Sequence, residues 1–222
     1  MNVLGLDTST AATSACLLRA DGVAFEVLPA ASRLTEPPAH SEELMPAVAE
    51  AMERAGVGWS ELGAVAVGVG PGGFTGLRIG VATARALARA SGAELHPVSS
   101  LAALAAGIDA PLRLPLIDAK RGELFAALYR GDQPVAQEQV LSPDDVVTRL
   151  GNGARSALAA GDGSIRFREV LEAAGVRVAP GDSELHVVRA LHLCRLAAST
   201  EPASPEAVFP NYLRDPDAVP SQ

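Results

Sequence analysis

Short apolar runs separated by polar turns open the chain and predict strands. Val3-Leu4-Gly5-Leu6 is followed by the polar turn Asp7-Thr8-Ser9-Thr10. Residues 14–19 and 23–28 then flank the pair Asp21-Gly22, which is typical of a tight hairpin. This pattern predicts three strands at the start of the chain.

A helix is expected after the next loop, where apolar positions recur at intervals of three or four. Ser41 is the candidate N-cap, and Gly56 is the candidate stop. Pro46 predicts either a later start or a kink, because proline has no N–H to donate within a helix. The apolar stripe of this helix consists of Leu44, Met45, Val48 and Met52.

A glycine-rich segment then joins a buried strand to a long helix. Residues 64–69 are apolar and bounded by glycine, as in a strand that is covered on both faces. Residues 70–80 carry the glycines, and an alanine-rich helix is expected to continue to about Ser91. A strand over 94–98 and a short helix over 99–106 complete the first half.

The second half predicts a three-stranded meander followed by helices. The strands are expected over residues 112–118, 123–130 and 135–141. Helices are expected over residues 143–150 and 185–199, and residues 151–163 between them are rich in glycine. Because this order partly repeats that of the first half, the pattern predicts an α/β protein with two related lobes, residues 1–107 and 108–199.

Charge and composition narrow the function. The net charge is −8 and the isoelectric point is about 5.0, so a large basic surface for RNA is not expected, and nucleic acid should be reached through a partner. Cys16 and Cys194 have no zinc-type spacing, which favours two buried, reduced thiols. No signal peptide and no apolar run of about 18 residues is visible, so we expect a cytoplasmic protein without a membrane segment.

Two segments carry candidate chemistry. The turn Asp7-Thr8-Ser9-Thr10 can present N–H groups and hydroxyls to a phosphate, or it can simply satisfy its own hydrogen bonds. The glycines of residues 70–76 indicate a close backbone approach, by a ligand or by a neighbouring helix. This segment is not a Walker loop, because it lacks the Gly-Lys-Ser/Thr ending. The small-residue face continues through Gly76, Gly80, Ala84 and Ala88.

Other ionisable residues carry weaker signals. The four histidines form no HxxxH or HExxH pair, so a histidine-based metal site is not expected. Asp118-Ala119-Lys120-Arg121 follows a predicted strand and can either hold an anion or form a solvated turn. No GxSxG nucleophile motif occurs.

Several segments, taken together, resemble a known family in order and spacing. They are Leu4-Gly5-Leu6-Asp7-Thr8-Ser9-Thr10, His40-Ser41-Glu42-Glu43-Leu44-Met45-Pro46, Gly70-Pro71-Gly72-Gly73-Phe74-Thr75-Gly76-Leu77-Arg78-Ile79-Gly80, Val98-Ser99-Ser100-Leu101, Ile117-Asp118-Ala119-Lys120-Arg121-Gly122-Glu123 and Pro210-Asn211-Tyr212-Leu213-Arg214. The family is TsaB, also called YeaZ. The resemblance spans the chain and is densest over residues 1–125, and Gly73 departs from it because the family usually carries serine there.

The resemblance implies a fold and partners. It implies the actin-like ATPase (ASKHA) fold, with two ribonuclease-H-like lobes and residues 200–222 returning to the first lobe. It also implies pairing with the related catalytic subunit TsaD and the small ATPase TsaE, which together form threonylcarbamoyladenosine (t6A) on tRNA. We expect a homodimer when the partner is absent, and contact with tRNA only through the complex.

The resemblance further implies that this chain is not the catalyst. TsaD carries a metal-binding HxxxH where this chain has Ser100 and Leu104, and neither side chain replaces imidazole on a metal. No catalytic residue and no metal ligand is therefore expected, and Asp7, Thr8, Ser9 and Thr10 are expected to be a vestigial phosphate loop. No cofactor is expected on this chain alone, although ATP or ADP can be placed at the junction with the partner.

Two alternatives stay open at this point: a stand-alone ATP-dependent phosphotransferase of the same fold, and a peptidase. The resemblance implies that the helices beginning near Leu44 and Leu77 pack against their counterparts in TsaD. The apolar stripe can instead face the lobe's own sheet, since one apolar face cannot serve both. The residues assigned to the partner interface are Leu44, Met45, Val48, Met52, Gly76, Leu77, Gly80, Val81, Ala84 and Ala88.

Overall fold

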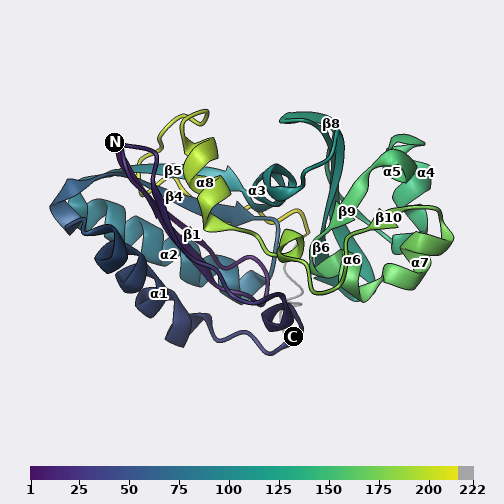
Figure 1. Cartoon of the computed structure of the whole chain (residues 1–222), viewed down its shortest axis with the longest axis horizontal. Coiled ribbons are helices and arrows are strands. Elements are labelled where there is room, and N and C mark those ends of the chain that lie inside the picture. Colours follow the sequence, from purple (N-terminus) through teal and green to yellow (C-terminus); the bar gives the residue numbers. More distant parts are fainter. Residues whose placement is uncertain (215–222) are drawn as a thin grey trace, which may run out of the picture.

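Two five-stranded sheets form the framework of the protein (Figure 1). The computed structural model of the 222-residue chain describes residues 1–214. Sheet A has the order β3-β2-β1-β4-β5 and consists of β1 (Asn2–Asp7), β2 (Ser14–Leu18), β3 (Ala24–Val27), β4 (Leu62–Gly70) and β5 (Glu94–Ser99). Sheet B has the order β10-β9-β6-β7-β8 and consists of β6 (Leu112–Lys120), β7 (Glu123–Arg130), β8 (Gln133–Leu141), β9 (Leu158–Ala160) and β10 (Arg177–Val178).

The two sheets share one topology. In each sheet the first strand is central, and it pairs with the second strand in an antiparallel hairpin that the third strand extends. The fourth strand runs parallel to the first on its other side, and the fifth runs parallel to the fourth. The α/β class is therefore confirmed. The lobe boundaries at 1–107 and 108–199 stay a prediction, and residues 215–222 of the expected returning segment lie outside the described residues.

Helices cover the sheets in layers (Figure 1). On one face of sheet A lie α1 (His40–Ala55) and α2 (Phe74–Ser91), and between the two sheets lie α3 (Ser100–Gly107) and α8 (Ala190–Ala197). Sheet B is covered by α4 (Val146–Leu150), α5 (Gly153–Ser156) and α7 (Arg168–Ala173), and α6 (Asp162–Arg166) packs against β6. Within residues 1–214 there are also four short 3-10 helices, which are η1 (Ala31–Thr35), η2 (Trp59–Glu61), η3 (Pro143–Asp145) and η4 (Glu184–His186). No helix within residues 1–214 has both the length and the apolarity to cross a membrane.

The size of the side chains decides how closely helices approach sheet A. Leu4 and Leu6 point toward α1 and α2, whereas the opposite face of the sheet carries small residues under α8. A Cβ atom added at Gly5 would lie 2.5 Å from the carbonyl oxygen of Ala190, so α8 lies directly on β1. Cys16 and Cys194 are buried and unpaired in this layer, as predicted.

Two helix predictions are wrong at their ends. The first helix begins at His40 and continues through Pro46, so the later start is excluded, and no side chain caps it, so Ser41 is not the N-cap. The helix expected over residues 185–199 is a 3-10 turn followed by the shorter α8. The reason is His186, which is buried and accepts a hydrogen bond from the Gly161 N–H at 3.1 Å. This contact draws the chain away from the helical path.

Candidate functional site

The polar side chains at the end of β1 and in the loop after it form hydrogen bonds with other groups of the protein. The Asp7 carboxylate is buried and accepts hydrogen bonds from the Ser9 N–H at 2.8 Å, the Ser9 hydroxyl at 2.7 Å and the Ser100 hydroxyl at 3.0 Å. Burial raises the pKa of Asp7, and these three hydrogen bonds oppose that shift. The oxygens that could hold a metal or orient a phosphate are therefore occupied by the protein's own donors.

This loop also explains the glycines. The Thr8 hydroxyl donates to the Gly76 carbonyl at 2.7 Å, and the Gly73 N–H donates to the Ser9 carbonyl at 2.7 Å. A Cβ atom at Gly76 would lie 2.1 Å from the Thr8 carbonyl oxygen, and one at Gly80 would lie 2.3 Å from the Thr8 hydroxyl. The close approach predicted from the glycines is confirmed, but its partner is the β1–β2 loop rather than a neighbouring helix.

A cavity of about 620 Å³ opens between this loop and sheet B. One wall is formed by Ser9, Thr10 and the first turn of α2. The opposite wall carries charged side chains, which are Asp118, Lys120, Asp162 and Arg166. The Thr10 hydroxyl is buried and has no hydrogen-bond partner among the described residues. The cavity is thus lined by hydroxyls on one side and by ionised groups on the other.

The charged wall is internally compensated. Asp118 is buried and accepts from Lys120 Nζ at 2.9 Å and from Arg166 Nη1 at 2.8 Å. Burial pushes the pKa of Asp118 upward, but the hydrogen bonds from Lys120 and Arg166 outweigh it and hold the pKa below its ordinary value. Asp162 accepts from the N–H groups of Asp118 and Gly163, and burial raises its pKa to about 6. The 118–121 segment is therefore neither a plain solvated turn nor a bare cation cluster.

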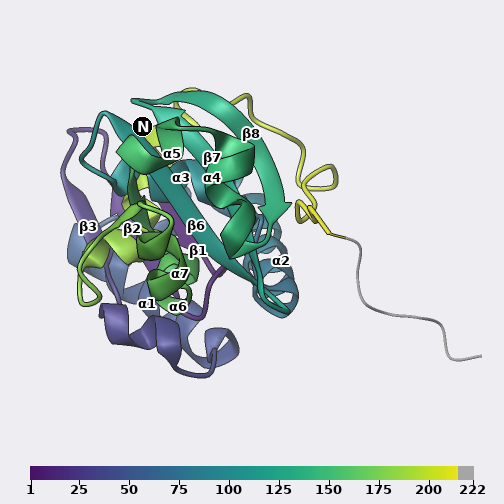
Figure 2. The same ribbon diagram turned by 90° about the vertical axis from the view of Figure 1, so that its right-hand side faces the viewer.

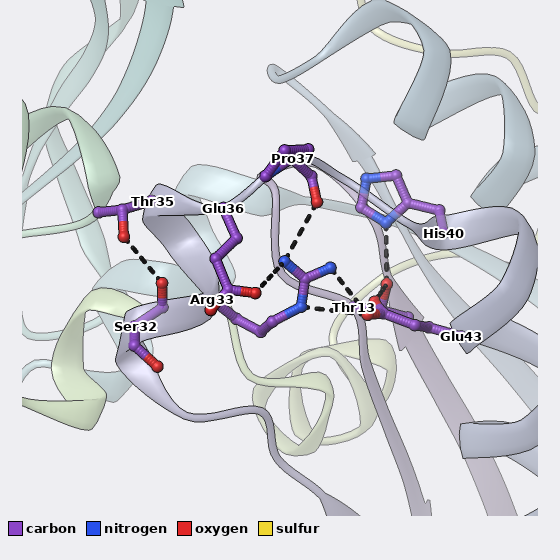
Figure 3. A network of polar contacts seen from close by, with 8 residues as sticks. All are labelled: Thr13, Ser32, Arg33, Thr35, Glu36, Pro37, His40 and Glu43. Carbon is purple, nitrogen blue, oxygen red and sulfur yellow. Dashed lines mark hydrogen bonds and ion pairs between the residues drawn. The ribbon is translucent and has the colours of Figure 1, made fainter.

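A polar network fixes the outer edge of the cavity (Figure 3). Arg33 donates to Glu43 through Nε at 3.1 Å and Nη2 at 2.7 Å, and to Glu36 and the Pro37 carbonyl at 3.1 Å each. The pKa of Glu43, which burial alone would raise, is held below its ordinary value by Arg33 and by the Thr13 hydroxyl. This network ties the loop of η1 to the start of α1.

His40 belongs to the same network. Its Nδ1 lies 2.8 Å from the Thr13 hydroxyl oxygen, and that hydroxyl donates its proton to Glu43 at 2.9 Å. A hydroxyl has one proton, so His40 must donate from Nδ1, which leaves Nε2 as an acceptor in the neutral ring. Burial lowers the pKa of His40, in partial opposition to the charge of Glu43. Burial therefore favours the neutral form of the ring at the edge of the cavity.

Most residues assigned to the partner interface lie inside this protein's own core. Seven have apolar side chains that are at most 5% exposed, which are Leu44, Val48, Met52, Leu77, Val81, Ala84 and Ala88. Gly76 and Gly80 are buried against Thr8, and Met45 is 43% exposed. The apolar stripe therefore faces the lobe's own sheet. Whether the outer faces of α1 and α2 contact a partner stays a prediction.

Ser100 and Leu104, which the resemblance sets against the metal-binding histidines of TsaD, are also internal. Ser100 is fully buried and donates to Asp7, and Leu104 packs in the core between the sheets. Within residues 1–214, no three His, Cys, Asp or Glu side chains come close enough to form a metal site.

Sequence reasoning missed residues of the cavity and of the polar network at its edge. Arg33 and Thr13 belong to segments without a motif, and only the fold brings them to Glu43. Asp162 follows β9, a strand of three residues in the glycine-rich segment 151–163, where the pattern indicated a short strand but no functional residue. The one available signal was the strand–glycine–aspartate order of residues 158–162, which places a carboxylate at the end of a strand, as β1 does with Asp7.

Known proteins resemble this chain over most of its length. The family model "TsaD: tRNA N6-adenosine threonylcarbamoyltransferase" matches residues 35–200. The tRNA threonylcarbamoyladenosine biosynthesis protein TsaB of Bacillus subtilis is 31% identical, covering 96% of this chain and 94% of that protein. The TsaB protein of Escherichia coli is 28% identical, covering 97% and 95%. An uncharacterized protein of Mycobacterium leprae is 42% identical over 145 residues, and the match spans 40% of that longer relative.

A solved structure of a YeaZ-like protein has the same fold as this chain. A crystal structure of a Pseudomonas aeruginosa protein, described as similar to the peptidase YEAZ, superposes with a TM-score of 0.81 at 31% identity. It covers 96% of this chain and 99% of that chain. Sequence and fold thus match over nearly the whole chain, the sequence with two TsaB proteins and the fold with a YeaZ-like structure. The chain belongs to the TsaB (YeaZ) family.

Proposed function

We propose that this chain is a non-catalytic accessory subunit of the complex that forms t6A on tRNA, and that it binds and organises a TsaD-like catalytic subunit. The observation that carries the proposal is the similarity to a TsaB protein over 96% of this chain and 94% of the relative. The shared strand order of the two sheets supports the finer assignment to the actin-like fold with two ribonuclease-H-like lobes.

The state of the first loop supports a non-catalytic role. The Asp7 carboxylate is engaged by Ser9 and Ser100, and Leu104 contributes an alkyl group to the core. A group that acts on a substrate must reach it, and these groups are buried in contacts with one another. Asp7, Thr8 and Ser9 therefore serve as structural residues in this proposal. Thr10 has a hydroxyl without a partner among the described residues, and it lines the cavity, which leaves room for a nucleotide at the junction with the partner.

The partner is proposed to contact the outer face of α1 and the side of α2 that lies beside α1. Met45 and Ala49 are exposed one turn apart on α1, and both helices lie on the outside of sheet A (Figure 1). The same face serves a homodimer when the partner is absent. Association with a TsaE-like ATPase and a cytoplasmic location stay predictions from the family.

A drop-out assay tests the function. Purified TsaD-like and TsaE-like partners are incubated with tRNA, ATP and the other substrates, with and without this chain, and t6A is quantified by mass spectrometry. We expect product only when this chain is present with its partners, and none from this chain alone. Product that is unchanged on omission would contradict the proposal, and phosphoryl transfer from ATP by the isolated chain would favour a phosphotransferase.

Substitutions on the surface test the binding face. Met45→Glu and Ala49→Glu should weaken co-purification with the TsaD-like subunit and leave the unfolding transition unchanged. Val135→Glu is the matched control, because Val135 is 52% exposed on β8, away from α1 and α2. Val48→Glu is unsuitable, because Val48 is fully buried and the change would unfold the lobe. Normal assembly of both α1 variants would exclude this face.

A further inference from the structure

Aromatic side chains gather on one exposed surface. The chain has eight aromatic residues, counted as five Phe, two Tyr and one Trp. Three of them are 37–65% exposed and lie on α2 and on the C-terminal segment beside it, which are Phe74, Phe209 and Tyr212. Leaving large rings in water forgoes the stabilisation of burying them, so a cluster of exposed rings marks a binding surface.

Arginines lie against these rings. The ring centroids of Phe74 and Tyr212 are 5.2 Å apart, and the Arg78 guanidinium carbon lies 3.7 Å from the centroid of Phe74. Arg78 Nε also donates to the Tyr212 hydroxyl at 3.1 Å. Seven residues further along α2, the Arg85 guanidinium carbon lies 5.6 Å from the centroid of the Phe209 ring. We call Phe74, Arg78, Arg85, Phe209 and Tyr212 the aromatic–arginine surface.

The backbone under this surface is fixed. The C-terminal segment runs antiparallel to α2 along the outside of the molecule (Figure 2). The Ala203 N–H donates to the Leu95 carbonyl at 2.8 Å, and the Asn211 N–H donates to the Val69 carbonyl at 2.6 Å. Val208 is buried in the core beneath α2, which turns its neighbour Phe209 outward. The rings are therefore presented on a rigid support, which lowers the entropy lost on binding.

The charge of this surface differs from that of the whole chain. The 18-residue helix α2 contains Arg78, Arg85 and Arg89 and no acidic residue, although the net charge of the protein is −8. Arg78 and Arg89 are eleven residues apart, about 16 Å along the helix axis. Arg89 is paired with Glu206, but neither Arg78 nor Arg85 forms an ion pair within residues 1–214. Arg78 and Arg85 thus keep guanidinium N–H groups that no carboxylate of residues 1–214 accepts, and Glu206, which is paired with Arg89, is the acidic neighbour on this surface.

We propose that the aromatic–arginine surface binds an unpaired stretch of the tRNA on which the complex acts. Single-stranded RNA is held by bases stacked on aromatic rings and by arginines that contact phosphates or stack on bases. Phe209 and Tyr212 supply ring faces, and Arg78 and Arg85 supply the cations. Aromatic side chains and arginine also occur at the centres of protein interfaces, so the experiment below measures binding of the TsaD-like subunit separately. The inference rests on the proposed function, and it departs from the expectation that tRNA is reached only through the partner.

Binding of tRNA to the assembled complex tests the surface. Fluorescence anisotropy is measured with a labelled, unmodified tRNA transcript and the complex of this chain with its TsaD-like subunit. Phe209→Leu keeps an apolar side chain but loses the ring face, so we expect binding at least about fivefold weaker. Phe209→Tyr and the control Trp59→Leu should bind within twofold of the unaltered complex, since Trp59 is 44% exposed at another site. Arg85→Gln should reduce the slope of log affinity against log salt by about 0.7.

The other outcomes overturn the proposal in separate ways. Unchanged tRNA affinity in both Phe209→Leu and Arg85→Gln would exclude RNA at this surface. Weaker binding of Phe209→Leu to the TsaD-like subunit, measured without tRNA, would make the surface a protein contact instead. If t6A forms without this chain, the proposed function fails. Anisotropy of the isolated chain then decides the present inference, and absence of tRNA binding there would refute it.

Discussion

The contact between Thr8 and α2 makes Gly76→Ala the sharpest test of how the first loop is held. Gly76 lies in the first turn of α2, where helix propensity alone predicts that alanine stabilises the protein by about 1 kcal/mol. The structure predicts the opposite sign. The added Cβ atom would lie 2.1 Å from the Thr8 carbonyl oxygen and 3.0 Å from His40 Nε2.

The magnitude follows from what must move. Real Cβ atoms essentially never approach a heavy atom within 3.0 Å, so the loop has to retreat from α2 by about 1 Å. That shift loosens the bonds from the Thr8 hydroxyl to Gly76 and from the Gly73 N–H to Ser9, each 2.7 Å long. Overpacking costs about 1–3 kcal/mol, and a buried hydrogen bond left unmade costs a similar amount. After the gain in helix propensity, a net loss of about 1–5 kcal/mol is expected.

Urea unfolding followed by circular dichroism measures this loss. The matched control is Gly73→Ala, because a Cβ atom there would lie 3.6 Å from the Ser9 carbonyl oxygen, an ordinary contact. We expect the midpoint of Gly76→Ala to fall with little change in the slope of the transition, and that of Gly73→Ala to stay close to the unaltered protein. A Gly76→Ala protein that unfolds at the same or a higher urea concentration would refute the reasoning.

Further predictions concern the cavity and the buried ionisable groups. Gly73→Ser adds a side-chain cap to α2, whose N-cap now makes none, and should raise the free energy of unfolding by about 0.5 kcal/mol in thermal denaturation. Burial raises the pKa of Asp162 to about 6, so its contribution to stability is lost as pH rises from about 4 to 6, and Asp162→Asn should remove a decline of up to about 3 kcal/mol. Burial lowers the pKa of His192 to about 4, so the free energy of unfolding falls as pH falls from about 6.5 to 4, and His192→Gln should remove that loss. Urea unfolding at several pH values should show that the Asp162 and His192 variants change the pH dependence of the free energy of unfolding in opposite directions. Arg33→Met leaves Glu43 without its main donor and should cost about 1–3 kcal/mol, measured by urea unfolding against Arg54→Met at an exposed site.

Much of the fold could be predicted because sheet strands carry a strong local signal. The runs around β1 and β4 are apolar throughout, since α1 and α2 cover one face and α8 covers the other. The hairpin at Asp21-Gly22 was predicted from its turn residues, and Gly22 adopts a φ of 87°. The order of strands was not predicted, because pairing between β1 and β4 joins segments that are sixty residues apart in sequence. The end of the last helix failed because a tertiary contact of His186 overrides local periodicity.

The site was harder to predict because one residue pattern is compatible with several kinds of contact. Glycines spaced along α2 indicate a close approach, but their spacing is the same for a ligand, a helix or a loop. The apolar stripe of Leu44, Val48 and Met52 is equally ambiguous, since a periodicity of three and four is produced by a core face and by an interface. Burial of all three at 5% exposure or less resolves the ambiguity in favour of the core. Thr13 and Arg33, by contrast, gave no local signal at all.

Helix α2 makes specific contacts on two of its sides. Its inner side is held by Thr8 and Ser9 through contacts that leave no room for a side chain at Gly76. Its outer side carries Arg78 and Arg85 against the rings of the C-terminal segment. If the added methyl group of Gly76→Ala pushes α2 away from the β1–β2 loop, Arg78 and Arg85 will therefore also move relative to the rings of Phe74 and Phe209. Loss of RNA binding in Gly76→Ala would consequently be an indirect effect, whereas loss in Phe209→Leu, whose side chain is 65% exposed, would be a direct one.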